Sequence, residues 1–181
     1  KKSHTHKILG HGEKPDYIDV IAMSSHITKH KPCWYCACPN QRQGRQCNKK
    51  VIPMSEDDLN GPFRCETCAA ELEHCQRRYI LNMTISDYSG QTWITAFNDE
   101  AEMMLNGKTA DELNLIMQSD HNKFTEVLNS LTLRPMRFTL RVKVETVNDE
   151  PRVKASVARV APIDFAKESK TLLGEIQALL M

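Results

Sequence analysis

The chain has 181 residues, and its 24 Lys and Arg against 23 Asp and Glu give a formal net charge of +1. This length suffices for one domain with attachments. A charge so near zero excludes a protein that is basic throughout, so any affinity for a polyanion depends on where the Lys and Arg residues are placed. No stretch approaches the roughly 20 apolar residues of a membrane helix, and no leader resembles a signal peptide. We therefore expect a soluble intracellular protein with no membrane partner.

The amino-terminal part of the chain, up to Cys75, contains three segments that differ in composition. Residues 1–15 contain three histidines, two glycines and scattered lysines without apolar periodicity, which indicates a linker. Residues 17–31 predict a long strand, because β-branched residues occur on both of its faces. From Cys33 to Cys75 the apolar periodicity stops, and all seven cysteines lie there among Pro, Asn, Gln, Gly and Arg. This segment is not expected to build a core of its own.

The strand pattern returns in residues 77–99, where DYSGQ supplies a turn, so we expect a hairpin there. One face of its first strand carries the apolar residues Tyr79, Leu81, Met83 and Ile85. Residues 99–130 change to helical spacing and predict two or three short helices.

A second hairpin is predicted over residues 134–162, joined through NDEP, with Phe138, Leu140, Val142 and Val144 facing one way. Five strand segments with helices before the fourth favour a mainly β fold, a small five-stranded Greek-key barrel. After Pro162 a helix is predicted that has six large apolar residues on one side: Phe165, Leu172, Leu173, Ile176, Leu179 and Leu180.

The cysteines favour a metal site in a reducing compartment, because their number is odd and they are bunched in one segment. Cys65 and Cys68 form a CxxC, whose two thiolates can hold one tetrahedral zinc ion. Spacing alone does not choose the partner pair among the upstream candidates Cys33, Cys36, Cys38 and Cys47. We prefer Cys38 and Cys47, which flank the polar loop PNQRQGRQ, and assign Cys33 and Cys36 to the preceding strand and the core.

The preferred ligands are therefore Cys38, Cys47, Cys65 and Cys68, holding one zinc ion. Four thiolates leave no open coordination position, so the metal would be structural and hydrolysis is not expected. Because the segment lacks apolar residues, metal binding should supply most of its folding free energy. For the remaining cysteines, Cys33, Cys36 and Cys75, the simpler interpretation is a buried free thiol.

Several strings together resemble the C-terminal DNA-binding domain of the replication protein A large subunit: ACP, CNKKV, GPFRCETC, RRYILNMTISD, QTWITAF and VKVETVNDEPRVKASV. The resemblance spans residues 17–180 in the same order. It implies an oligonucleotide-binding (OB) barrel with a zinc ribbon inserted between its first and second strands, and zinc ligands at the four preferred cysteines. It also implies a carboxyl-terminal helix that bundles with one helix from each of two smaller subunits in a heterotrimer.

This resemblance suggests a linker over 1–15, an OB-fold domain over 16–163 with the ribbon insertion at 36–76, and an oligomerisation helix over 164–181. It also implies a nuclear protein.

The chain departs from the family pattern in two ways. A longer loop between Cys38 and Cys47 leaves open a register in which Cys36 replaces Cys38, and Arg77 and Val147 stand where the family commonly has aromatic residues.

Trp93 and Phe97 lie four residues apart on one predicted strand, so both project from one face, where their rings can stack on unpaired bases of any sequence. The alternative is that both rings belong to the core. The polar face of the second hairpin is basic and would follow a phosphate backbone, although such faces are often only solvated: Arg137, Arg141, Lys143, Arg152 and Lys154. The cations near the cysteines extend this set by Lys49, Lys50 and Arg64.

The leading hypothesis is a non-catalytic, sequence-independent binder of single-stranded DNA within a heterotrimer that serves replication, repair and recombination. One alternative is a paralogue devoted to telomeres or meiosis. Another is a pure subunit-assembly module with little DNA contact, which Arg77 and Val147 would favour. An enzyme is the third class, and no Ser/His/Asp set, phosphate-cradling glycine loop or open metal site supports it.

Overall fold

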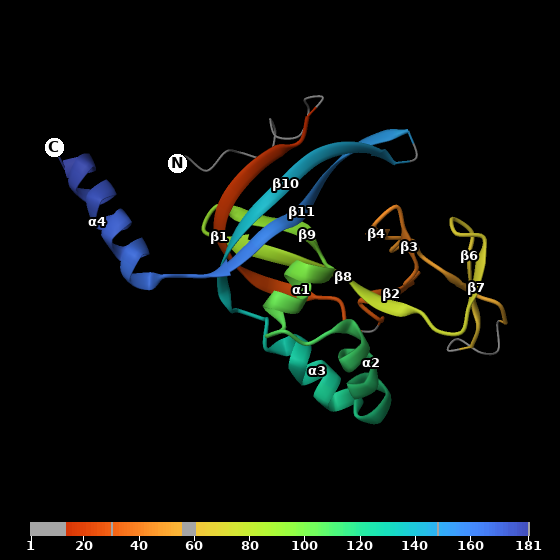
Figure 1. Ribbon diagram of the computed structural model, residues 1–181. Helices are drawn as coiled ribbons and strands as arrows, with labels where there is room; N and C mark the ends of the chain where they lie inside the picture. Colours follow the sequence, from red (N-terminus) through yellow and green to blue (C-terminus); the bar gives the residue numbers. More distant parts are fainter. Residues whose placement is uncertain (1–13, 30, 56–60, 148, 181) are drawn as a thin grey trace. The chain divides into compact units, whose positions relative to one another are not determined.

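The computed structural model describes residues 14–29, 31–55, 61–147 and 149–180 (Figure 1). The linker expected over 1–15 lies outside the described residues except for its last two positions. The chain forms two compact units. Unit 1 comprises the chain up to His26, Thr84–Ile94 and the chain from Thr132 onwards, and unit 2 comprises Ile27–Met83 and Thr95–Leu131.

The main sheet has six strands in the order β1-β10-β11-β9-β8-β2, and β1 also pairs with β8. The pairings of β1, β10, β11, β9 and β8 therefore form a ring, and β2 is attached to it through β8. The predicted mainly β fold with five principal strands is confirmed. The strands run over Asp16–Ile27 (β1), Trp34–Ala37 (β2), Gln76–Asp87 (β8), Gly90–Phe97 (β9), Pro135–Val147 (β10) and Glu150–Pro162 (β11).

Unit 1 is built on the long antiparallel hairpin of β10 and β11, which pairs with β1 on the other side of β10. Phe138, Leu140 and Val142 alternate along β10 and are buried, as the period of two predicts. Burying each such side chain contributes about 1.5–3 kcal/mol. The register with β11 shifts between Thr139 and Leu140, and such a bulge bends and twists the strand locally.

Three helices of unit 2 join β9 to β10: α1 (Asn98–Met104), α2 (Ala110–Ser119) and α3 (His121–Asn129). Thr109 caps α2 in a capping box, because its hydroxyl accepts from the Glu112 amide while the Glu112 carboxylate accepts from the Thr109 amide. Phe124 of α3 is fully buried. The two or three helices expected over 99–130 are thus confirmed as three.

Tyr79 of β8 anchors the start of α2 within unit 2. Its side chain is fully buried, and its hydroxyl lies 2.9 Å from the carbonyl oxygen of Thr109 and 3.1 Å from that of Lys108. Burial raises the pKa of this phenol, so it stays a hydrogen-bond donor throughout the physiological range.

The segment that contains the cysteines, residues 36–76, is called the cysteine ribbon below and belongs to unit 2. Its described residues form short strands: a pair of β3 (Gln41–Arg42) with β4 (Arg45–Gln46), and a sheet in the order β5-β6-β7. Gln43 and Gly44 join β3 to β4 with φ angles of 50° and 74°, which are the positive values of a tight hairpin turn. The three-stranded sheet consists of β5 (Ile52–Pro53), β6 (Phe63–Cys65) and β7 (Ala70–Leu72).

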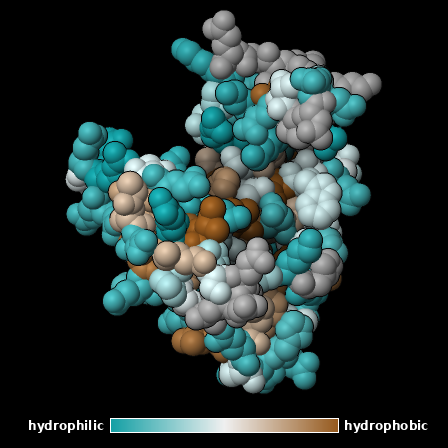
Figure 2. Space-filling view, turned by 90° about the vertical axis from the view of Figure 1, so that its right-hand side faces the viewer, coloured by the Kyte–Doolittle hydropathy of each residue, from teal (hydrophilic) through white to brown (hydrophobic). Residues whose placement is uncertain are grey.

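The chain ends in α4 (Phe165–Leu180), which follows β11 and has no buried residue (Figure 1). Among the described residues, no helix is long and apolar enough to cross a membrane. Hydrophilic side chains cover most of the face drawn in Figure 2, and hydrophobic residues occur there in smaller groups.

Candidate metal centre and nucleic-acid interface

Four thiols of the cysteine ribbon meet in one cluster, in which all Sγ atoms lie within 4.8 Å of one another: Cys38, Cys47, Cys65 and Cys68. The Sγ atoms of Cys38 and Cys68 are 3.8 Å apart, and those of Cys47 and Cys65 are 3.9 Å apart. Four Zn–S bonds of about 2.3 Å in a tetrahedron give sulfur–sulfur edges of about 3.8 Å. The cluster therefore has the donor type and the spacing of a four-thiolate zinc site.

Backbone hydrogen bonds on both sides of the cluster fix the ligand positions. The Cys38 amide donates to the Lys49 carbonyl at 2.8 Å, and the Cys47 amide donates to the Asn40 carbonyl at 2.7 Å. Among the described residues of the ribbon, Val51 and Phe63 are the buried apolar side chains that pack around the cluster. Such a small apolar core contributes little folding free energy. A cross-link such as a bound metal ion would therefore add substantially to the stability of the ribbon.

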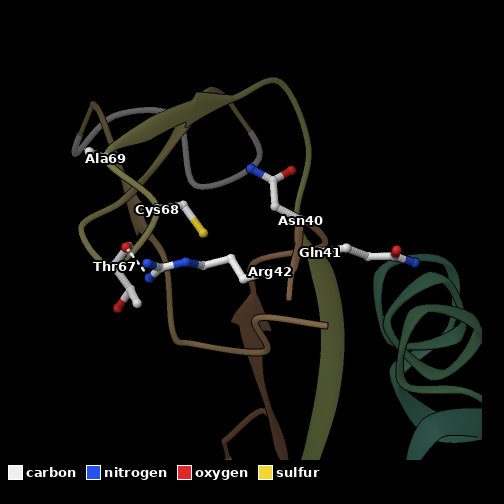
Figure 3. Close-up of a pocket in the computed structure, with 6 residues that line it drawn as sticks. All are labelled: Asn40, Gln41, Arg42, Thr67, Cys68 and Ala69. Carbon is white, nitrogen blue, oxygen red and sulfur yellow. Dashed lines mark hydrogen bonds between the residues drawn. The ribbon is translucent and has the colours of Figure 1, made fainter. Parts of the chain in front are cut away.

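The β3–β4 hairpin is held beside the turn that carries Cys68 (Figure 3). The Arg42 guanidinium donates a 2.7 Å hydrogen bond to the Thr67 carbonyl, and Figure 3 shows its side chain extending towards Thr67 with the Cys68 sulfur nearby. An open pocket of about 570 Å³ lies here, lined by Asn40, Gln41, Arg42, Thr67, Cys68 and Ala69. The longer loop of this chain is thus an ordered hairpin.

The other three cysteines stand outside the cluster. Cys33 is buried, and this burial raises the pKa of its thiol to about 12. Cys36 lies on β2, opposite Arg77 of β8, and its thiol hydrogen-bonds with that of Cys75. Of the two registers that the sequence left open, the structure has Cys38 and not Cys36 in the cluster.

Trp93 and Phe97 project from the outer face of β9. Their exposed fractions are 58% and 44%, whereas the intervening Ile94 and Ala96 are buried. The alternative that both rings lie in the core is therefore excluded by the structure. Exposed flat rings of this kind are what base stacking requires.

Two aromatic side chains of unit 1 were not singled out from the sequence. His26 of β1 lies edge-on to Trp93, with ring centroids 6.0 Å apart. Tyr17, which is 62% exposed, pairs in register with Arg141 on β10. Tyr17 is visible in the sequence only as an aromatic residue at the start of the first predicted strand. No local pattern in the sequence indicates the contact between His26 and Trp93.

Three of the five predicted cations on the polar face of the β10–β11 hairpin form ion pairs. Lys154 pairs with Glu145 at 3.1 Å, Arg152 contacts Glu150 at 3.5 Å, and Arg137 pairs with Glu168 of α4. Glu145, Glu150 and Glu168 therefore each contact one cation of this face. Of the five predicted cations, Arg141 and Lys143 form no ion pair within the described part of unit 1. Arg159 of β11, which lies opposite Thr139, is exposed and forms none there either, although it was not singled out from the sequence.

The remaining candidate cations, Lys49, Lys50 and Arg64, are exposed on the cysteine ribbon of unit 2. Arg77, at the position where the family commonly has an aromatic residue, forms a 3.0 Å ion pair with Asp111 of α2. It therefore ties β8 to α2 within unit 2. The side chain of Val147, the second departure, lies outside the described residues.

The comparisons with known proteins agree with this architecture. Residues 17–172 match the family model described as the replication factor-A C-terminal domain. The chain is 39% identical over 171 residues to the replication protein A 70 kDa DNA-binding subunit of Xenopus tropicalis, covering 94% of this chain and 26% of the relative. The Drosophila melanogaster subunit of the same name is 37% identical, with 94% and 27% covered. The chain thus spans about a quarter of the length of these curated relatives.

Two solved structures share the fold. A replication protein A heterotrimer bound to single-stranded DNA superposes with a TM-score of 0.81 at 35% identity, over 94% of this chain and 37% of that chain. Yeast replication protein A bound to single-stranded DNA gives 0.78 at 31% identity, over 96% and 92%. The fold and the cysteine cluster define a mainly β protein of the OB type with a carboxyl-terminal helix. The chain belongs to the replication factor-A C-terminal domain family.

Proposed function

We propose that the chain binds single-stranded DNA without sequence preference, as part of the large subunit of a heterotrimeric replication protein A. The observation that carries the proposal is the exposure of Trp93 and Phe97 on β9 between buried neighbours. Single-strand binders use exposed aromatic rings of this kind as stacking platforms for successive bases. Two solved relatives with this fold hold single-stranded DNA.

In this proposal, base stacking and phosphate contacts make separate contributions to the binding free energy. Each stacked base contributes roughly 1–3 kcal/mol and any base has a π-face, so stacking gives affinity without reading sequence. Arg141 and Lys143 supply charges that pair with no carboxylate of the described residues, and Arg137, Arg152 and Lys154 exchange an ion pair for a phosphate on binding. Lys49, Lys50 and Arg64 are the proposed phosphate contacts of unit 2.

The proposed metal is one structural zinc ion held by Cys38, Cys47, Cys65 and Cys68. When bound, zinc supplies a cross-link between the two ends of the ribbon and no reactive position, because four thiolates complete its tetrahedron. The sulfur–sulfur separations of 3.8 and 3.9 Å support this assignment. The proposed role is accordingly non-catalytic.

The proposed subunit contact is α4. Its apolar residues Phe165, Leu172, Leu173, Ile176, Leu179 and Leu180 are all at least half exposed in this chain alone. An apolar stripe of this length is stabilised by packing against other helices. We assign it to a three-helix bundle with two smaller replication protein A subunits.

The proposed division of the chain is an OB-fold domain over 16–163, with the ribbon insertion at 36–76, and an oligomerisation helix over 164–181. A nuclear location and a part in replication, repair and recombination accompany this proposal. They rest on the membership of the replication protein family and on the likeness to replication protein A subunits.

The second candidate function is a subunit-assembly module with little DNA contact. The observation that favours it is that Arg137, Arg152 and Lys154, three of the five predicted cations of the hairpin face, contact carboxylates of the described residues. In this alternative, α4 still forms the contact with the other subunits, and Trp93 does not bind DNA.

Fluorescence anisotropy with labelled oligonucleotides separates the two functions. The DNA-binding proposal predicts saturable binding of oligothymidine and of a mixed-sequence single strand with similar affinities, weaker binding of a duplex, and a steep loss with salt. The assembly alternative predicts no saturable binding of any of these probes at low salt. A strong preference for one sequence would contradict both.

A further inference from the structure

Two cysteines outside the metal cluster, Cys36 and Cys75, lie where the two ends of the cysteine ribbon join the β2–β8 strand pair, a place called the neck of the ribbon below. Cys36 lies on β2, at the amino-terminal end of the ribbon, and Cys75 directly precedes β8, at its carboxyl-terminal end. Their side chains hydrogen-bond to each other. All four thiols of the cluster lie between these two residues in the sequence. A covalent bond between Cys36 and Cys75 would therefore enclose the whole site.

The strand register explains why the two thiols meet. In the antiparallel β2–β8 pair, Cys36 is opposite Arg77 and Ala37 is opposite Gln76. Cys75 lies two positions before Arg77, so it falls on the same side of the pair as Cys36. Diagonal neighbours on one face of two antiparallel strands are about 7–8 Å apart in a regular pair. The register therefore places both residues on one face, and the hydrogen bond between their thiols brings the two side chains together.

Both thiols are accessible, which distinguishes them from the buried Cys33. Cys36 and Cys75 are each half-buried. Cys75 also lines a pocket of about 250 Å³ together with His74, Arg77 and Gln118. This opening admits a molecule as small as hydrogen peroxide.

We propose that Cys36 and Cys75 are a modification site, a thiol pair that hydrogen peroxide oxidises to a disulfide across the neck of the ribbon. One sulfur attacks a peroxide oxygen, the O–O bond breaks, and the departing hydroxide takes the thiol proton to form water, which leaves a sulfenic acid. The second sulfur then attacks the first, the S–O bond breaks, and hydroxide leaves with the second thiol proton as another water. Two thiols thus give two electrons to one peroxide.

The disulfide would keep the two ends of the ribbon together independently of the metal. A cross-link that closes a long loop restricts the unfolded chain most strongly. With zinc removed, the oxidised ribbon would keep its two ends joined by the disulfide, whereas the reduced ribbon would lose the cross-link that the metal provides. A dithiol reductant reverses the bond by thiol–disulfide exchange.

Thiol mapping on the intact chain tests the proposal. The purified protein, with whatever zinc it holds, is treated with hydrogen peroxide, alkylated, and digested for mass spectrometry, while released zinc is followed with a chromogenic chelator. We expect a peptide linked through Cys36 and Cys75 and the loss of two free thiols before zinc appears. Dithiothreitol restores both thiols.

Variants sharpen the result. Cys33→Ser, a matched control on the same neck, keeps the oxidation, whereas Cys36→Ser and Cys75→Ser each abolish the early loss of two thiols. The proposal is overturned if the parent chain shows linked peptides between cluster cysteines only, or if thiol loss and zinc release run in step. Mapping of the parent chain needs no variant to fold. DNA binding by the reduced protein is measured on the same samples, so a failure of the proposed function is seen separately.

Discussion

The imidazole ring of His26 lies edge-on to the indole ring of Trp93, with centroids 6.0 Å apart and planes inclined by 76°. An edge-to-face contact of this kind stabilises a ring pair by about 0.5–1.5 kcal/mol beyond the area that it buries. Trp93 is otherwise largely exposed, so His26 restricts the rotamers of a ring that we propose as a base platform. Ordering that ring before DNA arrives lowers the entropy cost of stacking.

The first prediction concerns this pair. Trp93→Ala should weaken binding of oligothymidine and of a mixed-sequence strand alike, by roughly 1–3 kcal/mol. His26→Ala should cost less, and the double variant should bind like Trp93→Ala alone, because His26 acts through the indole. Anisotropy titrations of the four proteins measure this cycle. Tyr88→Ala, which removes an exposed ring from the β8–β9 turn, is the control and should bind like the parent. Additive effects of the two substitutions would show that His26 does not act through Trp93.

The second prediction separates charge from stacking. Lys143 forms no ion pair within the described residues, so Lys143→Ala removes a cation that is free to contact phosphate. The slope of log K against log salt should fall by about 0.7–1 unit. Lys123→Ala on α3 serves as the matched control and should leave the slope unchanged. An unaltered slope in Lys143→Ala would remove this residue from the interface.

The third prediction concerns the metal. Cys38→Ser should lose zinc and the fold of the ribbon, because a missing thiolate leaves the tetrahedron incomplete. Cys36→Ser should retain one zinc ion per chain, since Cys36 lies outside the cluster. Metal analysis of both purified variants measures the ratio. Retention by Cys38→Ser together with loss by Cys36→Ser would establish the other register.

The fourth prediction concerns α4. A chain that ends at Pro162 should fail to assemble with the two smaller subunits on co-expression, because the exposed apolar stripe of α4 is removed. Its melting transition should stay close to that of the full chain, since no residue of α4 is buried. Size-exclusion chromatography with light scattering distinguishes trimer from monomer. A trimer that survives this truncation would place the subunit contact elsewhere.

Regular features of the structure were predictable because their signals are local. The alternation of Phe138, Leu140 and Val142 with polar residues predicts that they share a buried face, and they do. Thr109 and Glu112 have the spacing of a capping box in the sequence and form one in the structure. The CxxC at Cys65 and Cys68 likewise indicates a pair of metal ligands. These patterns depend only on neighbours in the chain, so they do not require knowledge of the fold.

Contacts between distant segments were not predictable in the same way. Arg137 meets Glu168 across 31 positions, and Arg77 meets Asp111 across 34, so neither ion pair has a local signature. The choice of Cys38 over Cys36 also depends on the fold, because β2 continues through Cys36 and ends at Ala37, which directs Cys38 into the cluster. The short β3–β4 hairpin is polar throughout and gives no apolar periodicity.

The proposal that Trp93 stacks on bases is tested most directly by its own fluorescence. The chain has two tryptophans, and Trp34 packs edge-on against Phe124 within unit 2, so Trp34→Phe leaves Trp93 as the only indole. We predict saturable quenching of this emission on titration with oligothymidine, with the same midpoint as the anisotropy curve. Emission that stays unchanged while the labelled strand becomes fully bound would contradict stacking on Trp93.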